Sequence, residues 1–318
     1  MEQKCICLEG VLAPVPTPFA VDGRILPRAL HANLALLARF PLRGFVALGS
    51  NGEFVLLSEK EKLQVLEKAR DAIPTDRLLV AGTGCESTSA TIALTKKAAR
   101  LGADAALVVT PSYYRGRMTT AALARHYLAV AEAAPIPVVL YNMPANTGVE
   151  LTPEVVLSIA GHPNVVGMKD SGGNIVAMAE ICRAAPPGFQ LLAGSAGFFL
   201  AALSVGAVGG IMALANIAPA ACCALWRHFR SGDLAAAQAL QLQLVGLNTA
   251  VTRLWGVAAL KKAMDMLGLY GGPVRAPLLP LAEDQTASLH ALLEESGLFA
   301  AWSHQGTVEA LAEGGARK

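Results

Sequence analysis

The chain has 318 residues; 53% of them are hydrophobic, 16% are charged, and the mean hydropathy is +0.45. Lys and Arg number 26 and Asp and Glu number 24, which gives a formal net charge of +2. This apolar content excludes a disordered chain, and the balanced charge gives no sign of a nucleic-acid partner. The length allows one large domain or two small ones.

The apolar composition raises the question of a membrane span. Residues 184–226 contain no Asp, Glu, Lys or Arg, and this run is longer than the roughly 20 apolar residues of a transmembrane helix. Pro and Gly break the run into short pieces, at Pro186, Pro187, Gly188, Gly194, Gly197, Gly206, Gly209, Gly210 and Pro219. Glu2, Lys4 and Glu9 interrupt any apolar core of a signal peptide. We therefore predict no interaction with a membrane.

Cysteine and histidine spacing gives no sign of a metal site. Six cysteines are too few for a disulfide scaffold in a chain of this length, and neither Cys-x-x-Cys nor His-Glu-x-x-His occurs. The six histidines are scattered, and none of them ends an expected strand. We predict reduced cysteines that pack as small apolar residues, no metal and no cofactor.

Eight short apolar runs alternate with amphipathic segments along the chain. They centre on Ala13, Val46, Leu79, Leu107, Val139, Val166, Leu192 and Ile211. Most carry Val, Ile or Leu on both faces, which is typical of strands in a parallel sheet covered on both sides. Between them lie helix starts, such as the capping box Ser58–Glu61, Thr152 followed by Pro153, and Ser87 before a helix that stops at Gly102.

Eight strand–helix repeats predict an α/β fold, a (β/α)8 TIM barrel with a C-terminal helical extension. An open doubly wound sheet is the alternative. We expect the barrel with its active site in residues 1–230, the extension in residues 231–300, and a frayed Gly/Ala-rich tail in residues 301–318.

Active sites of such barrels lie at the C-terminal ends of the strands, and Lys169 is the one lysine that ends an apolar strand. The others stand near the termini or on amphipathic helices, among them Lys261. Burial lowers the pKa of an ammonium group, and a neutral amine can form a Schiff base with a ketone. The alternative is an ion pair with a buried carboxylate such as Asp170 or Glu53.

Tyr141 ends the neighbouring strand, so its phenol could exchange protons with a substrate in the same cavity; the alternative is an ordinary tyrosine at the rim. The turn at residues 50–52 supplies backbone N–H groups suited to a carboxylate. Residues 82–87 imitate a dinucleotide fingerprint but lack its third Gly, so we predict no nucleotide cofactor.

Three motifs in this order resemble a known family. Residues 49–53 read GSNGE, residues 141–144 read YNMP, and residues 167–171 read GMKDS. The chain resembles, from about residue 10 to residue 298, the superfamily of Schiff-base-forming pyruvate aldolases and lyases that includes dihydrodipicolinate synthase and N-acetylneuraminate lyase. Further segments, among them VVTPSYYRGRM, LAGSAGF and YGGPVRAPL, are most similar to the 4-hydroxy-2-oxoglutarate aldolases within it.

The resemblance implies roles for particular residues. Lys169 would form the imine with a 2-oxo acid, and Tyr141 would relay protons. Ser50 would complete a hydroxyl chain with Tyr113, which would reach across a subunit interface. The remaining implied substrate-binding residues are Gly49, Asn51, Asn146, Ser171, Gly194, Ser195 and Ile211.

One position separates members of the superfamily. Dihydrodipicolinate synthases carry Arg two residues after the Pro of the tyrosine motif, whereas this chain has Asn146, which cannot grip a carboxylate with two parallel bonds. We therefore expect a lyase that cleaves 4-hydroxy-2-oxoglutarate, or a close analogue, to pyruvate and glyoxylate.

Several alternatives stay open at this point. They are a dihydrodipicolinate synthase, a 2-keto-3-deoxy sugar acid aldolase, and a non-catalytic barrel that binds oxo acids. The resemblance also implies a homotetramer. No mitochondrial leader precedes residue 10, so we expect a cytoplasmic protein.

Overall fold

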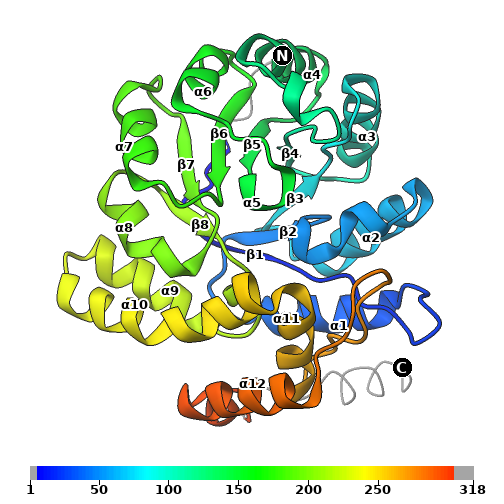
Figure 1. Ribbon diagram of the computed structural model, residues 1–318, viewed down its shortest axis with the longest axis vertical. Coiled ribbons are helices and arrows are strands. Elements are labelled where there is room, and N and C mark those ends of the chain that lie inside the picture. The colour runs from blue at the N-terminus through cyan, green and yellow to red at the C-terminus, as the bar shows by residue number, and fades with distance from the viewer. Residues whose placement is uncertain (1–5, 304–318) are drawn as a thin grey trace.

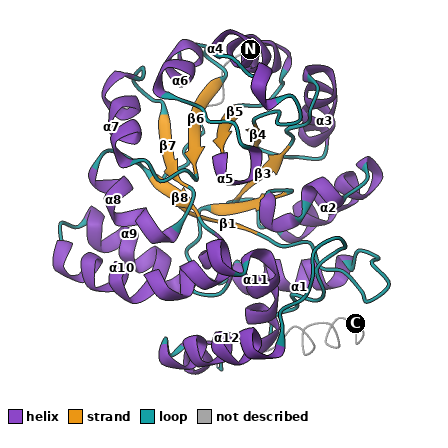
Figure 2. Ribbon diagram, in the orientation of Figure 1, coloured by secondary structure: helices purple, strands orange, loops and turns teal. Residues whose placement is uncertain are grey.

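The strands pair in parallel and close into a barrel. The computed structural model describes residues 6–303. Its strands are β1 (Gly10–Pro14), β2 (Gly44–Ala47), β3 (Leu78–Gly82), β4 (Ala105–Val109), β5 (Val138–Asn142), β6 (Val165–Asp170), β7 (Gln190–Ala193) and β8 (Gly209–Ile211). Each strand pairs with the next, and β8 returns to β1, with Leu12 opposite Ile211. The predicted TIM barrel is thus confirmed and the open sheet is excluded (Figure 2).

Helices surround the barrel (Figure 1). They are α1 (Pro27–Leu37), α2 (Glu59–Ala72), α3 (Thr88–Arg100), α4 (Thr120–Ala133), α5 (Pro144–Thr147), α6 (Pro153–Ala160), α7 (Ile175–Ala184), α8 (Phe199–Ser204) and α9 (Pro219–Arg230). The short α5 lies inside the ring of the others in the view of Figure 1. The expected caps form: the Ser58 and Glu61 side chains complete the capping box of α2, and Ser87 and Thr152 cap α3 and α6.

The barrel separates two apolar cores. The inner one consists of Leu8, Leu12, Val46, Val80, Ala105, Leu107, Val139, Tyr141, Leu192 and Ile211. The outer one lies between the strands and the helices and is far larger. The uncharged run of residues 184–226 falls on β7, α8, β8 and most of α9, where few charges are needed because both faces of these strands are covered. Within residues 6–303, no helix has both the length and the apolar character needed to cross a membrane.

The C-terminal extension packs on one side of the barrel, beside α9 and α1 (Figure 1). It contains α10 (Leu234–Thr249), a π-helical turn η6 (Ala250–Leu254), α11 (Gly256–Met266), α12 (Glu283–Glu295) and α13 (Leu298–Trp302). Helix α13 crosses the expected boundary at residue 300. Trp302 is buried and donates a hydrogen bond to the Ile217 carbonyl at 2.6 Å, so the packed structure extends into the expected tail. Residues 304–318 of that tail lie outside the described residues.

Candidate active site

Strands β5 and β6 bring Lys169 and Tyr141 together inside the barrel. The two residues are register partners on the adjacent strands, and both are buried. The Lys169 Nζ lies 4.1 Å from the centroid of the Tyr141 ring. Since successive side chains of a strand point to opposite faces, the next residue, Asp170, is directed away from the barrel interior.

Asp170 shapes the loop after β6 instead of pairing with Lys169. Its carboxylate accepts hydrogen bonds from the Asn142 side chain at 2.7 Å and from the backbone N–H groups of Gly172 and Gly173 at 2.9 and 3.0 Å. Among the described residues, no carboxylate forms an ion pair with Lys169. The ion-pair interpretation of Lys169 is therefore wrong, and its amine faces the Tyr141 ring.

Ser50 extends the polar group from the end of β2. It begins a short 3-10 turn, η1 (Ser50–Gly52), and its Oγ lies 3.1 Å from the Tyr141 hydroxyl. Leu48 and Glu53 on either side of this turn are the two non-glycine residues with positive φ among residues 6–303, at 61° and 53°. Such conformations cost energy outside glycine and are held in place by their surroundings. The hydroxyl is thus carried by a strained, fixed loop.

Two contacts hold that loop in place. The Thr17 hydroxyl donates to the Gly52 carbonyl at 2.7 Å, and the Asn51 side chain donates to the Pro14 carbonyl at 3.4 Å. Gly82 on β3 has no side chain because a Cβ there would collide with the Leu48 carbonyl. The conformation of the loop is therefore determined by residues of three neighbouring strands and the segments that follow them, and not by its own sequence alone.

The environment of Tyr141 favours its ionised form. Burial by itself would raise the pKa of the phenol, but the nearby Lys169 charge and the hydrogen bond from Ser50 oppose burial, and the pKa of Tyr141 falls below its ordinary value. A phenol with a lowered pKa loses its proton more readily near neutral pH, as a proton carrier must.

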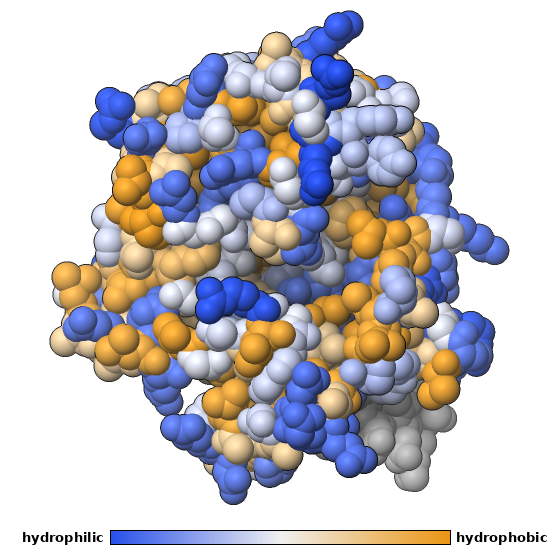
Figure 3. Space-filling model, viewed as in Figure 1, coloured by the Kyte–Doolittle hydropathy of each residue, from blue (hydrophilic) through white to orange (hydrophobic). Residues whose placement is uncertain are grey.

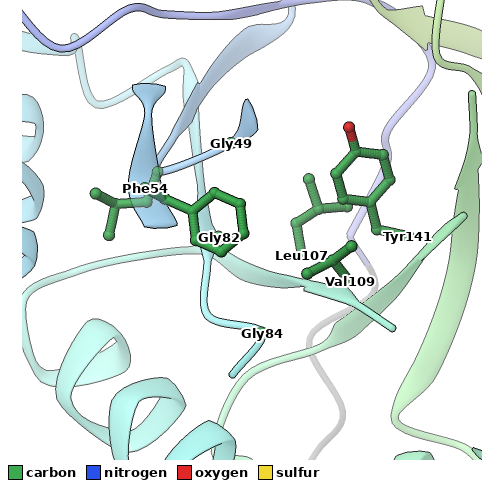
Figure 4. Close-up of a pocket in the computed structure, with 8 residues that line it drawn as sticks. Gly49, Phe54, Gly82, Gly84, Leu107, Val109 and Tyr141 are labelled. Carbon is green, nitrogen blue, oxygen red and sulfur yellow. The ribbon is translucent and has the colours of Figure 1, made fainter. Parts of the chain in front are cut away.

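A small pocket opens beside this group. Its lining consists of Leu48, Gly49, Phe54, Gly82, Gly84, Leu107, Val109 and Tyr141. Phe54 and Tyr141 face each other across it (Figure 4). Figure 3 shows that the corresponding face of the molecule is hollowed near its middle, with hydrophilic and apolar surface mixed around the hollow. The Gly49 backbone and the Tyr141 side chain thus share one cavity wall.

Other expected site residues lie around the strand ends with different surroundings. Ile211 is buried inside the barrel. Gly194 packs so closely on Ser171 that a Cβ would collide with the Ser171 hydroxyl, which fixes the ends of β6 and β7 together. Ser195 accepts a hydrogen bond from Asn248 of α10 at 3.0 Å and caps the turn that follows β7, so its hydroxyl already has structural partners.

Asn146 and Tyr113 are not gathered into this group. Asn146 lies exposed on α5. Tyr113 is 79% exposed, and its ring makes an edge contact with Tyr114. Its loop is held by Glu86, whose carboxylate accepts the backbone N–H groups of Ser112 and Tyr113 at 3.0 and 2.8 Å. In a single chain, the expected hydroxyl relay ends at Ser50.

Sequence reasoning missed Lys261, which it assigned to an amphipathic helix. In the structure its side chain is 1% exposed, and its Nζ lies 2.6 Å from Oε1 of Glu53, the residue that follows the η1 turn. A weak signal exists: Glu53 follows a buried strand, and a buried carboxylate needs a cation. Nothing in the sequence identifies which cation.

Within the described ranges, no three or more His, Cys, Asp or Glu side chains gather into a group that could hold a metal ion.

Comparison with known proteins agrees with the geometry. A family model described as the dihydrodipicolinate synthetase family matches residues 7–296. A 4-hydroxy-tetrahydrodipicolinate synthase from Methanothrix thermoacetophila is 37% identical over 285 residues, covering 89% of this chain and 95% of that protein. A probable mitochondrial 4-hydroxy-2-oxoglutarate aldolase from Emericella nidulans is 35% identical over 292 residues, covering 90% and 94%.

A solved structure has the same fold over nearly the whole chain. The chloride-inhibited dihydrodipicolinate synthase from Acinetobacter baumannii, complexed with pyruvate, has a TM-score of 0.88 and 32% identity, and the match covers 92% of this chain and 100% of that one. Relatives with two different reactions are thus about equally similar, and identity alone does not choose between their substrates.

Proposed function

The chain belongs to the dihydrodipicolinate synthetase family and is a lyase of its aldolase type, and we propose that it cleaves 4-hydroxy-2-oxoglutarate to pyruvate and glyoxylate through a Schiff base on Lys169. The observation that carries the chemistry is the buried Lys169 amine, 4.1 Å from the Tyr141 ring and without a carboxylate partner among the described residues. An amine in such surroundings is free to attack a ketone.

The proposed steps follow from this arrangement. Lys169 passes its proton to the Tyr141 phenolate, and the resulting amine adds to C2 of the substrate. The carbinolamine hydroxyl then leaves as water with that proton from Tyr141, which gives an iminium ion and restores the phenolate. The C3–C4 electron pair then moves into the iminium as the C4 hydroxyl loses its proton to the Tyr141 phenolate, which leaves an enamine and glyoxylate. Protonation at C3 and hydrolysis release pyruvate. Ser50, 3.1 Å from the Tyr141 hydroxyl, would pass protons onward.

Two observations bear on the acceptor. Asn146 offers no guanidinium for the carboxylate of aspartate semialdehyde. Arg115 lies beside the same turn: its Nη1 is 3.4 Å from the position that a Cβ on Gly148 would take. No ion pair or hydrogen bond of the Arg115 side chain is found within residues 6–303. We propose that this guanidinium meets the second carboxylate of the substrate, which favours an acid such as glyoxylate over a neutral aldehyde.

We also propose a homotetramer, since the exposed Tyr113 could join a hydroxyl relay only as part of a neighbouring subunit's site. A dihydrodipicolinate synthase reaction, which joins pyruvate and aspartate semialdehyde, is the second candidate function, favoured by the 37% identity to the 4-hydroxy-tetrahydrodipicolinate synthase of Methanothrix thermoacetophila.

Trapping with borohydride tests the mechanism. Pyruvate and borohydride should add a reduced adduct to Lys169 of the wild type, located by peptide mass spectrometry, and none to Lys169→Ala. An adduct elsewhere, or none on the wild type, would refute the Schiff base. Assays of pyruvate with glyoxylate, aspartate semialdehyde or glyceraldehyde then identify the acceptor. If turnover is fastest with aspartate semialdehyde, the second candidate function replaces the first.

A further inference from the structure

A second polar centre lies next to the candidate active site and joins it to the C-terminal extension. The Glu53 and Lys261 side chains are each 1% exposed, and the Lys261 Nζ donates to Glu53 Oε1 at 2.6 Å. The other carboxylate oxygen, Oε2, accepts the backbone N–H of Arg275 at 2.8 Å. Both oxygens of Glu53 are therefore engaged by the extension, although the residue belongs to the loop after β2.

The cation is held as firmly as the carboxylate. The Lys261 Nζ also donates to the Pro273 carbonyl at 2.8 Å and lies 4.3 Å from the Phe19 ring centroid. The Arg275 guanidinium lies at the same distance from that ring. Phe19, from the loop after β1, thus contacts both cationic side chains of the extension and fixes the site of the pair.

The contacts of Glu53 lead directly to the catalytic hydroxyls. Its backbone N–H donates to the Ser50 carbonyl at 3.1 Å, which closes the η1 turn. Ser50 Oγ in turn lies 3.1 Å from the Tyr141 hydroxyl. Glu53 keeps its left-handed backbone conformation, with φ of 53°, while its side chain is anchored to α11 and the following loop. A movement of the carboxylate would therefore rotate the turn that aims the Ser50 hydroxyl.

A buried ion pair is a poor choice if its only task is to hold two elements together. Apolar residues of similar volume do this as well or better, because both charges must be removed from water. What a carboxylate adds is direction, since each oxygen accepts hydrogen bonds preferentially near its lone-pair directions. This pair lies at the end of the strained loop, so its directional hydrogen bonds can fix the orientation of the η1 turn.

We propose that Glu53 and Lys261 are positioning residues of the active site: the pair fixes the η1 turn so that the Ser50 hydroxyl meets Tyr141. Neither side chain touches the substrate. The C-terminal extension is then a working part of the site, and its contribution passes through Ser50. This inference rests on the proposed role of Ser50 in proton transfer.

A double-mutant cycle with Ser50 tests the proposal. Glu53→Gln keeps the shape of the side chain and removes its charge. We expect kcat for retro-aldol cleavage to fall about 10- to 100-fold with KM changed less than about 3-fold, because a misplaced group of this kind has that effect on rate. Adding Glu53→Gln to Ser50→Ala should lower kcat less than about 2-fold further, since the two act through one contact. If the fold-loss of kcat in the double variant equals the product of the two single losses, the proposal is overturned.

A matched control separates positioning from stability. Glu61→Gln removes the ion pair between Arg275 and α2, another link between the extension and the barrel, at 2.7 Å. It should lower Tm without changing kcat or the titration of Tyr141 followed by phenolate absorbance. Glu53→Gln should shift that titration to higher pH. Equal losses of kcat in the two variants would contradict a specific role for Glu53.

The paired variant Glu53→Gln/Lys261→Met covers the case in which Glu53→Gln does not fold. It leaves no uncompensated buried charge, so Tm should recover while kcat stays low; full recovery of kcat would show that the charge pair is only structural. The wild-type adduct distinguishes this inference from the proposed function. If pyruvate is trapped on Lys169 but the Ser50 cycle is multiplicative, the positioning role alone fails. If no adduct forms, the proposed function fails. The Tyr141 titration, compared between Glu53→Gln and Glu61→Gln, still tests the contact between Glu53 and Ser50.

Discussion

At the scale of single residues, the site depends on how one phenol is surrounded. Tyr141 is buried between the Lys169 amine and the Ser50 hydroxyl, and these two groups offset the effect that burial has on its pKa. Each neighbour contributes to the same property, the readiness of the phenol to lose a proton. Changing a neighbour should therefore change the pH dependence of the reaction and not only its rate.

The change Ser50→Ala should move the rate profile to higher pH. A hydrogen bond from Ser50 favours the phenolate, so its loss raises the pKa of Tyr141. Because the proposed cleavage step needs the phenolate, its rate rises as pH passes upward through that pKa, and the variant should reach half of its maximal kcat at a higher pH. Measurement of kcat between pH 6 and about 10.5 checks this. An unchanged midpoint with a lower rate at every pH would contradict the assigned contact.

Individual residues differ in how far the sequence could predict them. Lys169 and Tyr141 could be found because each ends an apolar strand, and parallel strands present their carboxyl ends at one edge. Lys261 could not, because it stands beside Lys262 on an amphipathic helix and only the folded chain brings it to Glu53. The alternative that paired Lys169 with Asp170 was likewise wrong. The Asp170 side chain points away from the barrel interior and accepts a hydrogen bond from the Gly172 backbone in the loop that follows β6.

At the scale of elements, strands and helix caps could be predicted well, whereas the connections that tie the extension to the barrel could not. All eight expected strands form around their expected centres, because the buried runs have a local signal. The π-helical turn η6 and the loop around Arg275 carry no such signal. The contacts of the Arg275 loop join residues more than two hundred positions apart, such as Arg275 and Glu61.

Acid should reveal the contact between Arg275 and Glu61. The hydrogen bond with Arg275, assisted by Ser58 and opposed by burial, lowers the pKa of Glu61 to about 2. A carboxylate with a depressed pKa in the folded state adds stability that is present above its ordinary value of 4.5 and is lost as pH falls toward 2.

Glu61→Gln should therefore have a free energy of unfolding about 1–2 kcal/mol lower than that of the wild type at pH 7, after allowance for partial exposure. It should unfold at a lower denaturant concentration. The difference should shrink steadily between pH 4.5 and 2. Urea denaturation at a series of pH values measures it, and a difference that stays constant down to pH 2 would rule out the assigned ion pair.

The short helix α5 and the loop carrying Arg115 should together determine acceptor choice. Arg115→Ala should lower kcat/KM for 4-hydroxy-2-oxoglutarate by about 10-fold or more, because a guanidinium bound to a carboxylate contributes a charge-assisted hydrogen bond. Cleavage of an analogue whose second carboxylate is replaced by a neutral group should change little. Arg117→Ala, on the same turn, is the control. Equal losses for both substrates would mean that Arg115 does not read the carboxylate.

At the scale of the whole molecule, the last described helix holds the extension against the barrel. The Trp302 indole is 5% exposed, donates to the Ile217 carbonyl after β8, and lies 5.4 Å from the Phe40 ring. The described part of the chain thus returns, at Trp302, to the region that follows β8. The expected frayed tail starts at residue 301, but its first two residues belong to α13, because a helix this short gives little periodicity to recognise.

Trp302→Ala should destabilise the fold by about 3 kcal/mol or more, the usual effect of removing a large buried aromatic side chain. Trp302→Phe should lose less, since it keeps the ring contact and gives up only the hydrogen bond. Thermal unfolding followed by circular dichroism compares the two. If both variants match the wild type, the helix α13 frays independently of the barrel.

The separation of Glu53 and Lys261 has a consequence for the chain during its synthesis. The two residues are 208 positions apart, so at about 5–20 residues per second a ribosome needs about 10–40 s to pass from one to the other. Ser50 emerges just before that interval, and Tyr141 and Lys169 emerge within it, while Glu53 is still without its Lys261 partner. A nascent chain halted before Lys261 would contain every residue of the proposed Schiff-base chemistry and still have a slack, exposed catalytic loop. Full activity would thus begin only after Lys261 has left the ribosome.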